Sequence, residues 1–140
     1  MLHDIGYSEA VQQTGFHPVD GARYLRLSGW PPAVCDAVAH HSGSRYVALV
    51  RRLEPDLAEF SFAEDEVSDA LTVADQTVGP GGVPMAIHVR IADLLRRHGP
   101  DSPNALAHAR RGPYLLATAK RVAERLSSQG IPPQQHGISG

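Results

Sequence analysis

The chain has 140 residues, a formal net charge of −2 and one cysteine. Its length fits one domain, and its charge gives no basic field that attracts nucleic acid or anionic lipid. No apolar run approaches the roughly 20 residues that cross a bilayer, and residues 1–4 lack the pattern of a signal peptide, so we expect a cytoplasmic protein with no membrane partner. Cys35 has no second cysteine to pair with, which agrees with that reducing compartment.

The first half of the chain predicts a series of short helices. Apolar side chains recur there at helical spacing, and Val34 and Val38 share one face with His41. Gly, Ser and Pro residues mark the ends of the segments. The predicted helices cover residues 1–7, 8–13, 18–27, 31–41 and 45–53, the last bounded by Pro55.

The second half of the chain predicts fewer and longer helices. They cover residues 62–78, 84–97 and 103–127, with a loop at 79–82 and a candidate break at Gly112 and Pro113. No alternating apolar pattern of strand length is present. The predicted fold class is therefore all-α, a compact multi-helix bundle over residues 1–128 followed by a flexible tail at 129–140.

Polar residues near helix ends and apolar faces are the candidates for chemistry. The sequence contains eight histidines, and histidine is the commonest metal ligand. The candidates are His3, Asp4, His17, His40, His41 and Asp75. Imidazole and carboxylate together suit manganese, iron or zinc better than calcium, which prefers oxygen alone. A zinc finger built on thiolates is excluded, because the chain has a single cysteine.

Four short blocks of this sequence resemble the HD superfamily of metal-dependent phosphohydrolases. They are LHDIGY at residues 2–7, TGFHPVDGA at 14–22, AHHSG at 39–43 and ADQT at 74–77. Their order, spacing and helical setting match the family. The resemblance implies an HD-domain-like helical bundle that hydrolyses a phosphoester or phosphoanhydride. The expected partner is a phosphorylated small molecule, with nucleotides among the candidate substrates.

The resemblance also implies roles for three of the candidates. His3 would bind one metal ion, Asp4 would bridge two ions or bind a single one, and Asp75 would supply the final carboxylate ligand. The cofactor would be one or two divalent transition-metal ions, such as Mn, Fe or Zn. Water activated by the metal would attack phosphorus, and Asp4 is an expected catalytic residue for this step.

Two further ligands are implied by the dinuclear members of the family. His17 and one of His40 and His41 resemble these second-metal ligands. His41 shares the apolar face of its predicted helix, so we prefer it as the ligand. His40 would then face the substrate or act behind the ligands, and it is the second expected catalytic residue, as a proton donor to the leaving group.

The resemblance is incomplete at its start. The first metal-ligating histidine of the family lies on a helix upstream of the HD pair, whereas His3 follows Leu2 and Met1. We therefore expect an N-terminally truncated chain with impaired activity, whose metal site is weak, mononuclear or empty. The apolar patch uncovered by a missing helix predicts self-association, with a homodimer as the expected form.

Two other functional classes compete with the hydrolase. The first is a catalytically silent regulatory module that keeps the HD shape and binds a nucleotide or a partner without turnover. The second is a helix-turn-helix regulator, because residues 18–41 hold two predicted helices joined by a turn. The second of these helices, at residues 33–41, has no Arg or Lys to contact phosphate or guanine. Nucleic acid is therefore not an expected partner.

Overall fold

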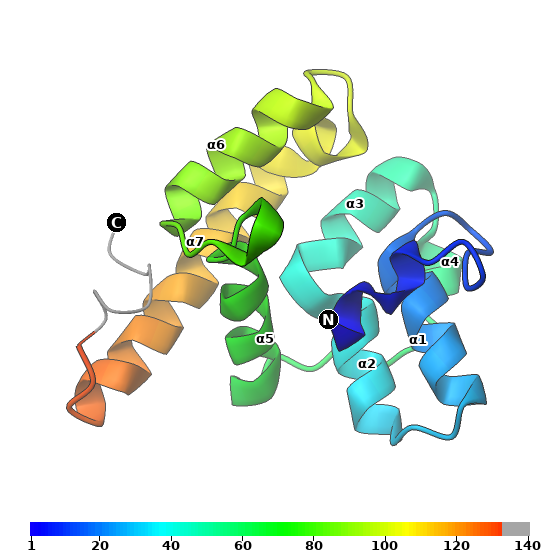
Figure 1. Cartoon of the computed structure of the whole chain (residues 1–140), viewed down its shortest axis with the longest axis horizontal. Helices are drawn as coiled ribbons and strands as arrows, with labels where there is room; N and C mark the ends of the chain where they lie inside the picture. Colours follow the sequence, from blue (N-terminus) through cyan, green and yellow to red (C-terminus); the bar gives the residue numbers. More distant parts are fainter. Residues whose placement is uncertain (133–140) are drawn as a thin grey trace.

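The computed structural model describes residues 1–132 (Figure 1). Within that range the chain forms seven α-helices, three 3₁₀ turns and no strand, which confirms the all-α fold class. In chain order the elements are η1 (Leu2–Tyr7), α1 (His17–Leu27), α2 (Pro32–His40), η2 (His41–Gly43), α3 (Ser44–Arg51), α4 (Glu54–Leu57), α5 (Glu66–Gln76), η3 (Pro80–Gly82), α6 (Ile87–His98) and α7 (Pro103–Ser128). Residues 133–140, which belong to the predicted tail, lie outside the described residues.

Two features of the first half differ from the prediction. Residues 8–13 form turns and not a helix. The carboxylate of Asp20 accepts hydrogen bonds from the backbone N–H groups of Gln13, Thr14 and Gly15, which holds the chain against the start of α1. The helix predicted at 45–53 ends before Pro55, as α3 does at Arg51, but the prediction missed the short helix α4, in whose first turn Pro55 lies and where its missing N–H has no helical partner to lose.

The second half also contains one prediction that is wrong. Helix α7 runs through Pro113 without a break at Gly112, because apolar side chains on both sides of the proline, Ala107 and Leu115, are buried in hydrophobic clusters. Tertiary packing therefore outweighs the local penalty of a proline inside a helix.

Two hydrophobic clusters divide the described helices into two halves. The first cluster is formed mainly by α1, α2 and α3, and its most buried members include Val19, Ala22, Leu25, Cys35 and Ala39. The second cluster joins α5, α6 and α7 through Val73, Ile87, Leu115 and Ala119. Helix α3 packs on α7 and connects the halves. Figure 1 shows the N-terminal segment beside α1, on which η1 packs, and the contact of His3 with Asp75 joins η1 to the end of α5.

Asp20 anchors the turn that precedes α1, and it is 1% exposed. Besides the three backbone donors, the Thr14 hydroxyl donates to its Oδ1 at 2.8 Å. Burial alone raises the pKa of the Asp20 carboxyl, but the hydrogen bonds from Thr14, Gln13 and Gly15 outweigh burial, so the net pKa is lowered. The carboxylate is therefore the stable form at neutral pH.

We expect Asp20→Asn to lower the free energy of unfolding by about 2 kcal/mol at neutral pH, because hydrogen bonds to a buried charged acceptor are lost. The native pKa lies below the unfolded value of about 3.9, so this contribution is complete above pH 4 and is lost as the pH falls through the native pKa. Urea unfolding from pH 3 to 7 measures both effects. Glu9→Gln, at an exposed position of the same segment, is the control. Equal stability of Asp20→Asn and wild type at pH 7 would contradict the prediction.

Candidate metal centre

The 3₁₀ turn η1 presents His3 and Asp4 to the space between the two halves. His3 is 5% exposed, and its Nε2 lies 3.2 Å from Asp4 Oδ2 and 3.4 Å from Asp75 Oδ1. This nitrogen is buried and has no hydrogen-bond partner among the described residues. The pKa of His3 is raised, chiefly by the Asp75 carboxylate and against the opposing effect of burial. A buried ring nitrogen that faces two carboxylate oxygens is suited to share a cation with them.

His41 follows the last residue of α2, and its side chain is 4% exposed. Its Nδ1 lies 2.6 Å from the carbonyl oxygen of Val38. Because a carbonyl can only accept, Nδ1 carries the proton, and the neutral ring keeps a lone pair on Nε2. Burial lowers the pKa of His41, which favours this neutral form. A backbone contact of this kind orients metal-ligating histidines.

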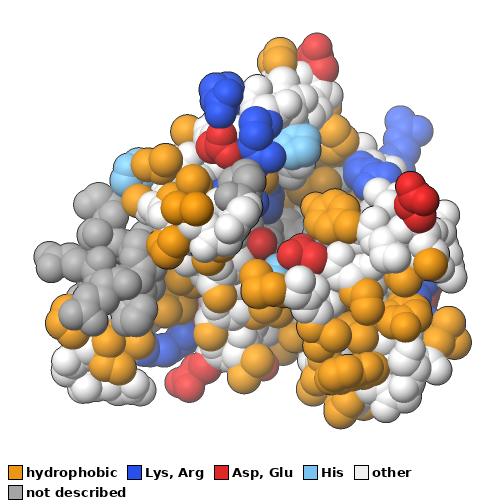
Figure 2. Space-filling model, viewed as in Figure 1, with side chains coloured by type: hydrophobic (Ala, Val, Ile, Leu, Met, Phe, Trp, Pro, Cys, Tyr) orange, Lys and Arg blue, Asp and Glu red, His pale blue; other side chains and the backbone are white. Residues whose placement is uncertain are grey.

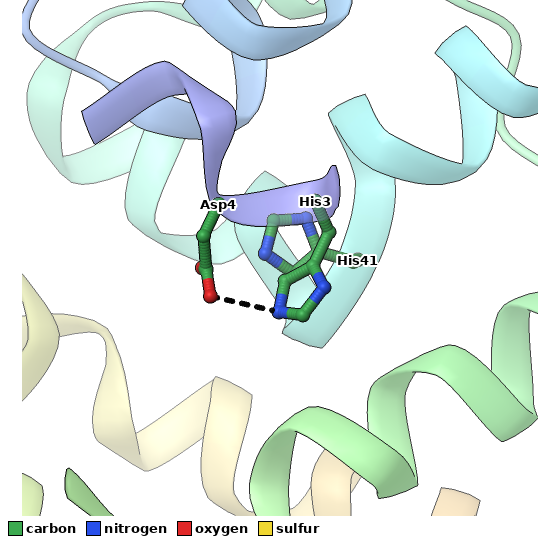
Figure 3. A group of neighbouring side chains, drawn as sticks. All are labelled: His3, Asp4 and His41. Atoms are coloured by element: carbon green, nitrogen blue, oxygen red, sulfur yellow. Dashed lines mark ion pairs between the residues drawn. The ribbon is translucent and has the colours of Figure 1, made fainter. Parts of the chain in front are cut away.

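His3, Asp4 and His41 each offer one ligand atom, and these atoms all lie within 4.8 Å of one another. Figure 3 shows the two rings side by side, with the Asp4 carboxylate directed to the ring of His3. The centroids of the two rings are 5.0 Å apart, at an interplanar angle of 66°. Two imidazoles and a carboxylate at this separation form a set of ligands for a divalent transition metal.

His17, the first residue of α1, lies beside this group. Its Nε2 is 3.3 Å from the Nε2 of His41. Two imidazoles bound to one tetrahedral ion at about 2.0–2.1 Å place their nitrogens about 3.3 Å apart, so this spacing fits a shared ion. Without an ion the same contact serves as a hydrogen bond. Burial, followed by the nearby His41, lowers the pKa of His17 to about 3, and Tyr7 stacks on its ring at a centroid distance of 3.9 Å.

Asp75 closes the cluster from the last turn of α5. One carboxylate oxygen, Oδ1, faces His3, while Oδ2 accepts hydrogen bonds from the Ser42 hydroxyl and from Gln76 Nε2. Burial opposes ionisation of this carboxyl, but its contacts with His3, His41 and Ser42 hold its pKa well below the usual range. The carboxylate is thus both ionised and held in one orientation.

Ser42 and Gln76 are functional candidates that the sequence prediction missed. Ser42 adopts a left-handed backbone conformation with φ of 54°, and its N–H donates to Thr72 Oγ1. This turn directs the Ser42 side chain to α5 and brings it to Asp75. Both residues lie in the motif blocks, directly after the predicted ligands His41 and Asp75. This adjacency is the sequence feature from which their role could have been predicted.

The structure does not bring His40 to the cluster. Its Nε2 donates to the carbonyl oxygen of Phe60 at 2.9 Å, and its ring meets the ring of Phe62 edge-on. Helix α2 ends at His40, and the extended backbone of His41 beyond it carries the second side chain in a different direction. We therefore correct the expectation that His40 faces the substrate, and we assign it no catalytic role.

The cluster opens into a cleft of about 930 Å³ between the two halves. Asp4, His17, His41 and Asp75 line it, and four arginines line it as well: Arg51, Arg90, Arg97 and Arg111. Figure 2 shows this face hollowed near its middle, where acidic, histidine and basic side chains meet. A cleft of this volume accommodates a ligand of nucleotide size.

The fold and site define an all-α protein with a histidine and carboxylate cluster in a cleft between two helical halves. No family model, curated protein or solved structure matches the chain. Among the described residues, no helix combines the length and the apolar character that crossing a bilayer requires.

Proposed function

We propose that this chain is a metal-dependent phosphohydrolase that acts on a phosphoester or phosphoanhydride. The observation that carries the proposal is the meeting of five predicted ligands from four separate segments: His3, Asp4, His17, His41 and Asp75. The blocks that resemble the HD superfamily contain all five. The set combines nitrogen and oxygen donors, which suits Mn, Fe or Zn.

Each residue of the cluster has its own role in the proposed metal site. His41 donates its Nδ1 proton to the carbonyl oxygen of Val38 and offers Nε2, while His3 offers an Nε2 that has no hydrogen-bond partner among the described residues. Asp4 and Asp75 supply negative charge, and Ser42 fixes the orientation of Asp75. A bound divalent ion would supply Lewis-acid chemistry, because it would polarise a phosphoryl oxygen and lower the pKa of a bound water toward about 7.

The first test is metal uptake coupled to hydrolysis. Protein treated with a chelator and then dialysed should bind Mn²⁺, Fe²⁺ or Zn²⁺, with one or two ions per chain by elemental analysis and a raised melting temperature, because the ion binds only the folded state. Hydrolysis of p-nitrophenyl phosphate and of a nucleotide panel should depend on the restored metal.

The same experiment separates the competing functions. Hydrolysis that persists in excess chelator, or a protein that takes up no metal, would contradict the proposal. Uptake of metal and nucleotide without any product would instead favour the catalytically silent regulatory module. His88→Gln is a useful control, because it changes an exposed histidine that does not line the cleft.

A further inference from the structure

Most arginines outside the cleft have a clear partner in the protein. Five of them form ion pairs with carboxylates: Arg23, Arg26, Arg96, Arg121 and Arg125. Arg45 lies over the rings of Tyr46, Phe62 and Tyr114. Arg90 and Arg111, both in the cleft, have no carboxylate within ion-pair distance among the residues that the structure describes.

Arg90 projects from α6 into the cleft. Its Nε and Nη1 are buried, and neither has a hydrogen-bond partner within residues 1–132. Burying a charged donor without a partner is costly, so a protein rarely keeps one for stability alone. The position therefore favours an anion that residues 1–132 do not supply.

Arg111 projects from α7 into the same cleft. Its Nε donates to the carbonyl oxygen of Ser42 at 2.8 Å, and its Nη1 lies 3.3 Å from Asn104 Oδ1, so both partners are neutral. Burial lowers the pKa of Arg111; Asp75 opposes this effect and the charge of Arg90 adds to it. The two guanidinium groups thus repel each other, and the Ser42 contact ties Arg111 to the residue that orients Asp75.

The charges of the cleft favour an anion, and they favour a dianion where a bound metal ion offsets Asp4 and Asp75. Four arginines line it, against the two carboxylates of Asp4 and Asp75. Arg97 is neutralised by Asp93, and Arg51 donates to the carbonyl oxygens of Thr14 and Gly15. Arg51 keeps its charge but is directed to backbone carbonyl oxygens, so Arg90 and Arg111 are the pair available to a ligand, and two guanidinium groups match the oxygens of a phosphate.

We propose that Arg90 and Arg111 bind the dianionic phosphate of a phosphate monoester, which makes monoesters, and not diesters, the substrate class of this cleft. The assignment of a substrate rests on the proposed function; the anion site itself does not. The phosphate is held beside the metal ligands because Arg111 contacts Ser42, which in turn contacts Asp75.

The test uses the full chain in the metal-free state and inorganic phosphate as the probe. Calorimetry and thermal shift at constant ionic strength should detect phosphate binding by the wild type. Arg90→Gln should weaken that binding about 10-fold or more, because a charge-assisted contact is lost. Methyl phosphate should bind like inorganic phosphate, and dimethyl phosphate, a monoanion, should bind more weakly.

Two controls separate this role from a structural one. Arg96→Gln and Arg110→Gln change exposed arginines of the same two helices and should leave phosphate binding unchanged. Arg90→Gln should keep or raise the melting temperature without phosphate, because Nε and Nη1 lose no protein hydrogen bond. Arg111→Gln loses its Ser42 contact, so Arg90 carries the test if the Arg111 variant does not fold.

Phosphate binding by Arg90→Gln equal to that of wild type overturns the proposal, as does equal affinity for methyl and dimethyl phosphate. A failure of the proposed function looks different. In that case the protein takes up no metal and releases no phosphate from its substrates, yet binding of inorganic phosphate still depends on Arg90.

Discussion

Replacing Asp75 with Asn is expected to weaken divalent-metal binding at least about 100-fold and to abolish metal-dependent phosphate release. The side chain is nearly isosteric, so Ser42 and Gln76 keep an acceptor oxygen, but the charge that faces His3 at 3.4 Å disappears. Metal titration by calorimetry measures the loss of affinity, and circular dichroism checks that the fold persists.

Two further variants show whether the loss of metal affinity is specific to the Asp75 carboxylate. Ser42→Ala removes the hydroxyl that orients Asp75 while it leaves the predicted ligands in place, so metal affinity should fall about 10-fold. Asp101→Asn, which removes an exposed carboxylate outside the cleft, should have no effect. If Asp75→Asn binds metal as tightly as Asp101→Asn does, Asp75 is not a ligand and the metal centre must be reassigned.

Gly6→Ala is expected to cost at least about 3 kcal/mol of unfolding free energy, because the backbones of η1 and α1 meet at this position. A Cβ at Gly6 would lie 2.0 Å from the carbonyl oxygen of His17 and 2.7 Å from the backbone nitrogen of Gly21. Both are backbone atoms, so no side-chain movement relieves the overlap. The turn that carries His3 and Asp4 must then move away from α1.

The Gly6 variant should therefore lose metal affinity together with stability, although no ligand has been changed. Urea unfolding and metal titration on the same sample measure the two effects. Gly21→Ala is the matched control on the facing backbone: its Cβ would lie 3.1 Å from the nitrogen of Gly6, which requires a much smaller shift. A Gly6→Ala protein as stable as wild type would show that η1 does not pack on α1 in this way.

Local sequence pattern predicted the choice between two adjacent histidines. His41 shares the apolar face of Val34 and Val38, and it is the one that lies in the cluster. The same reasoning wrongly predicted a helix at residues 8–13 and a candidate helix break at Pro113. A helix of six residues is too short to be stable by itself, and the hydrogen bonds to Asp20 hold the end of this segment in a turn. In α7, buried apolar side chains on both sides of Pro113 stabilise a continuous helix.

The sequence predicted which residues form the candidate site, but it did not predict how their side chains are arranged in space. The blocks pointed to His3, Asp4, His17, His41 and Asp75, but nothing in their spacing indicated that Ser42 would adopt a left-handed turn. Arg90 and Arg111 lie on helices that carry no matching block. The proposed role of these two arginines depends on the cleft between the two helical halves, which the sequence pattern does not reveal.

Helical periodicity, capping residues and the absence of strand patterns are local properties, so the amino-acid sequence by itself determined the all-α class and most helix positions. The residues able to ligate a metal were likewise readable from the chain. Only the tertiary structure decided which of them meet, that His40 turns to Phe60, and that Arg90 and Arg111 line the same cleft as the cluster. The physical reason is that these contacts join segments far apart in the chain, and the packing of whole helices sets their geometry.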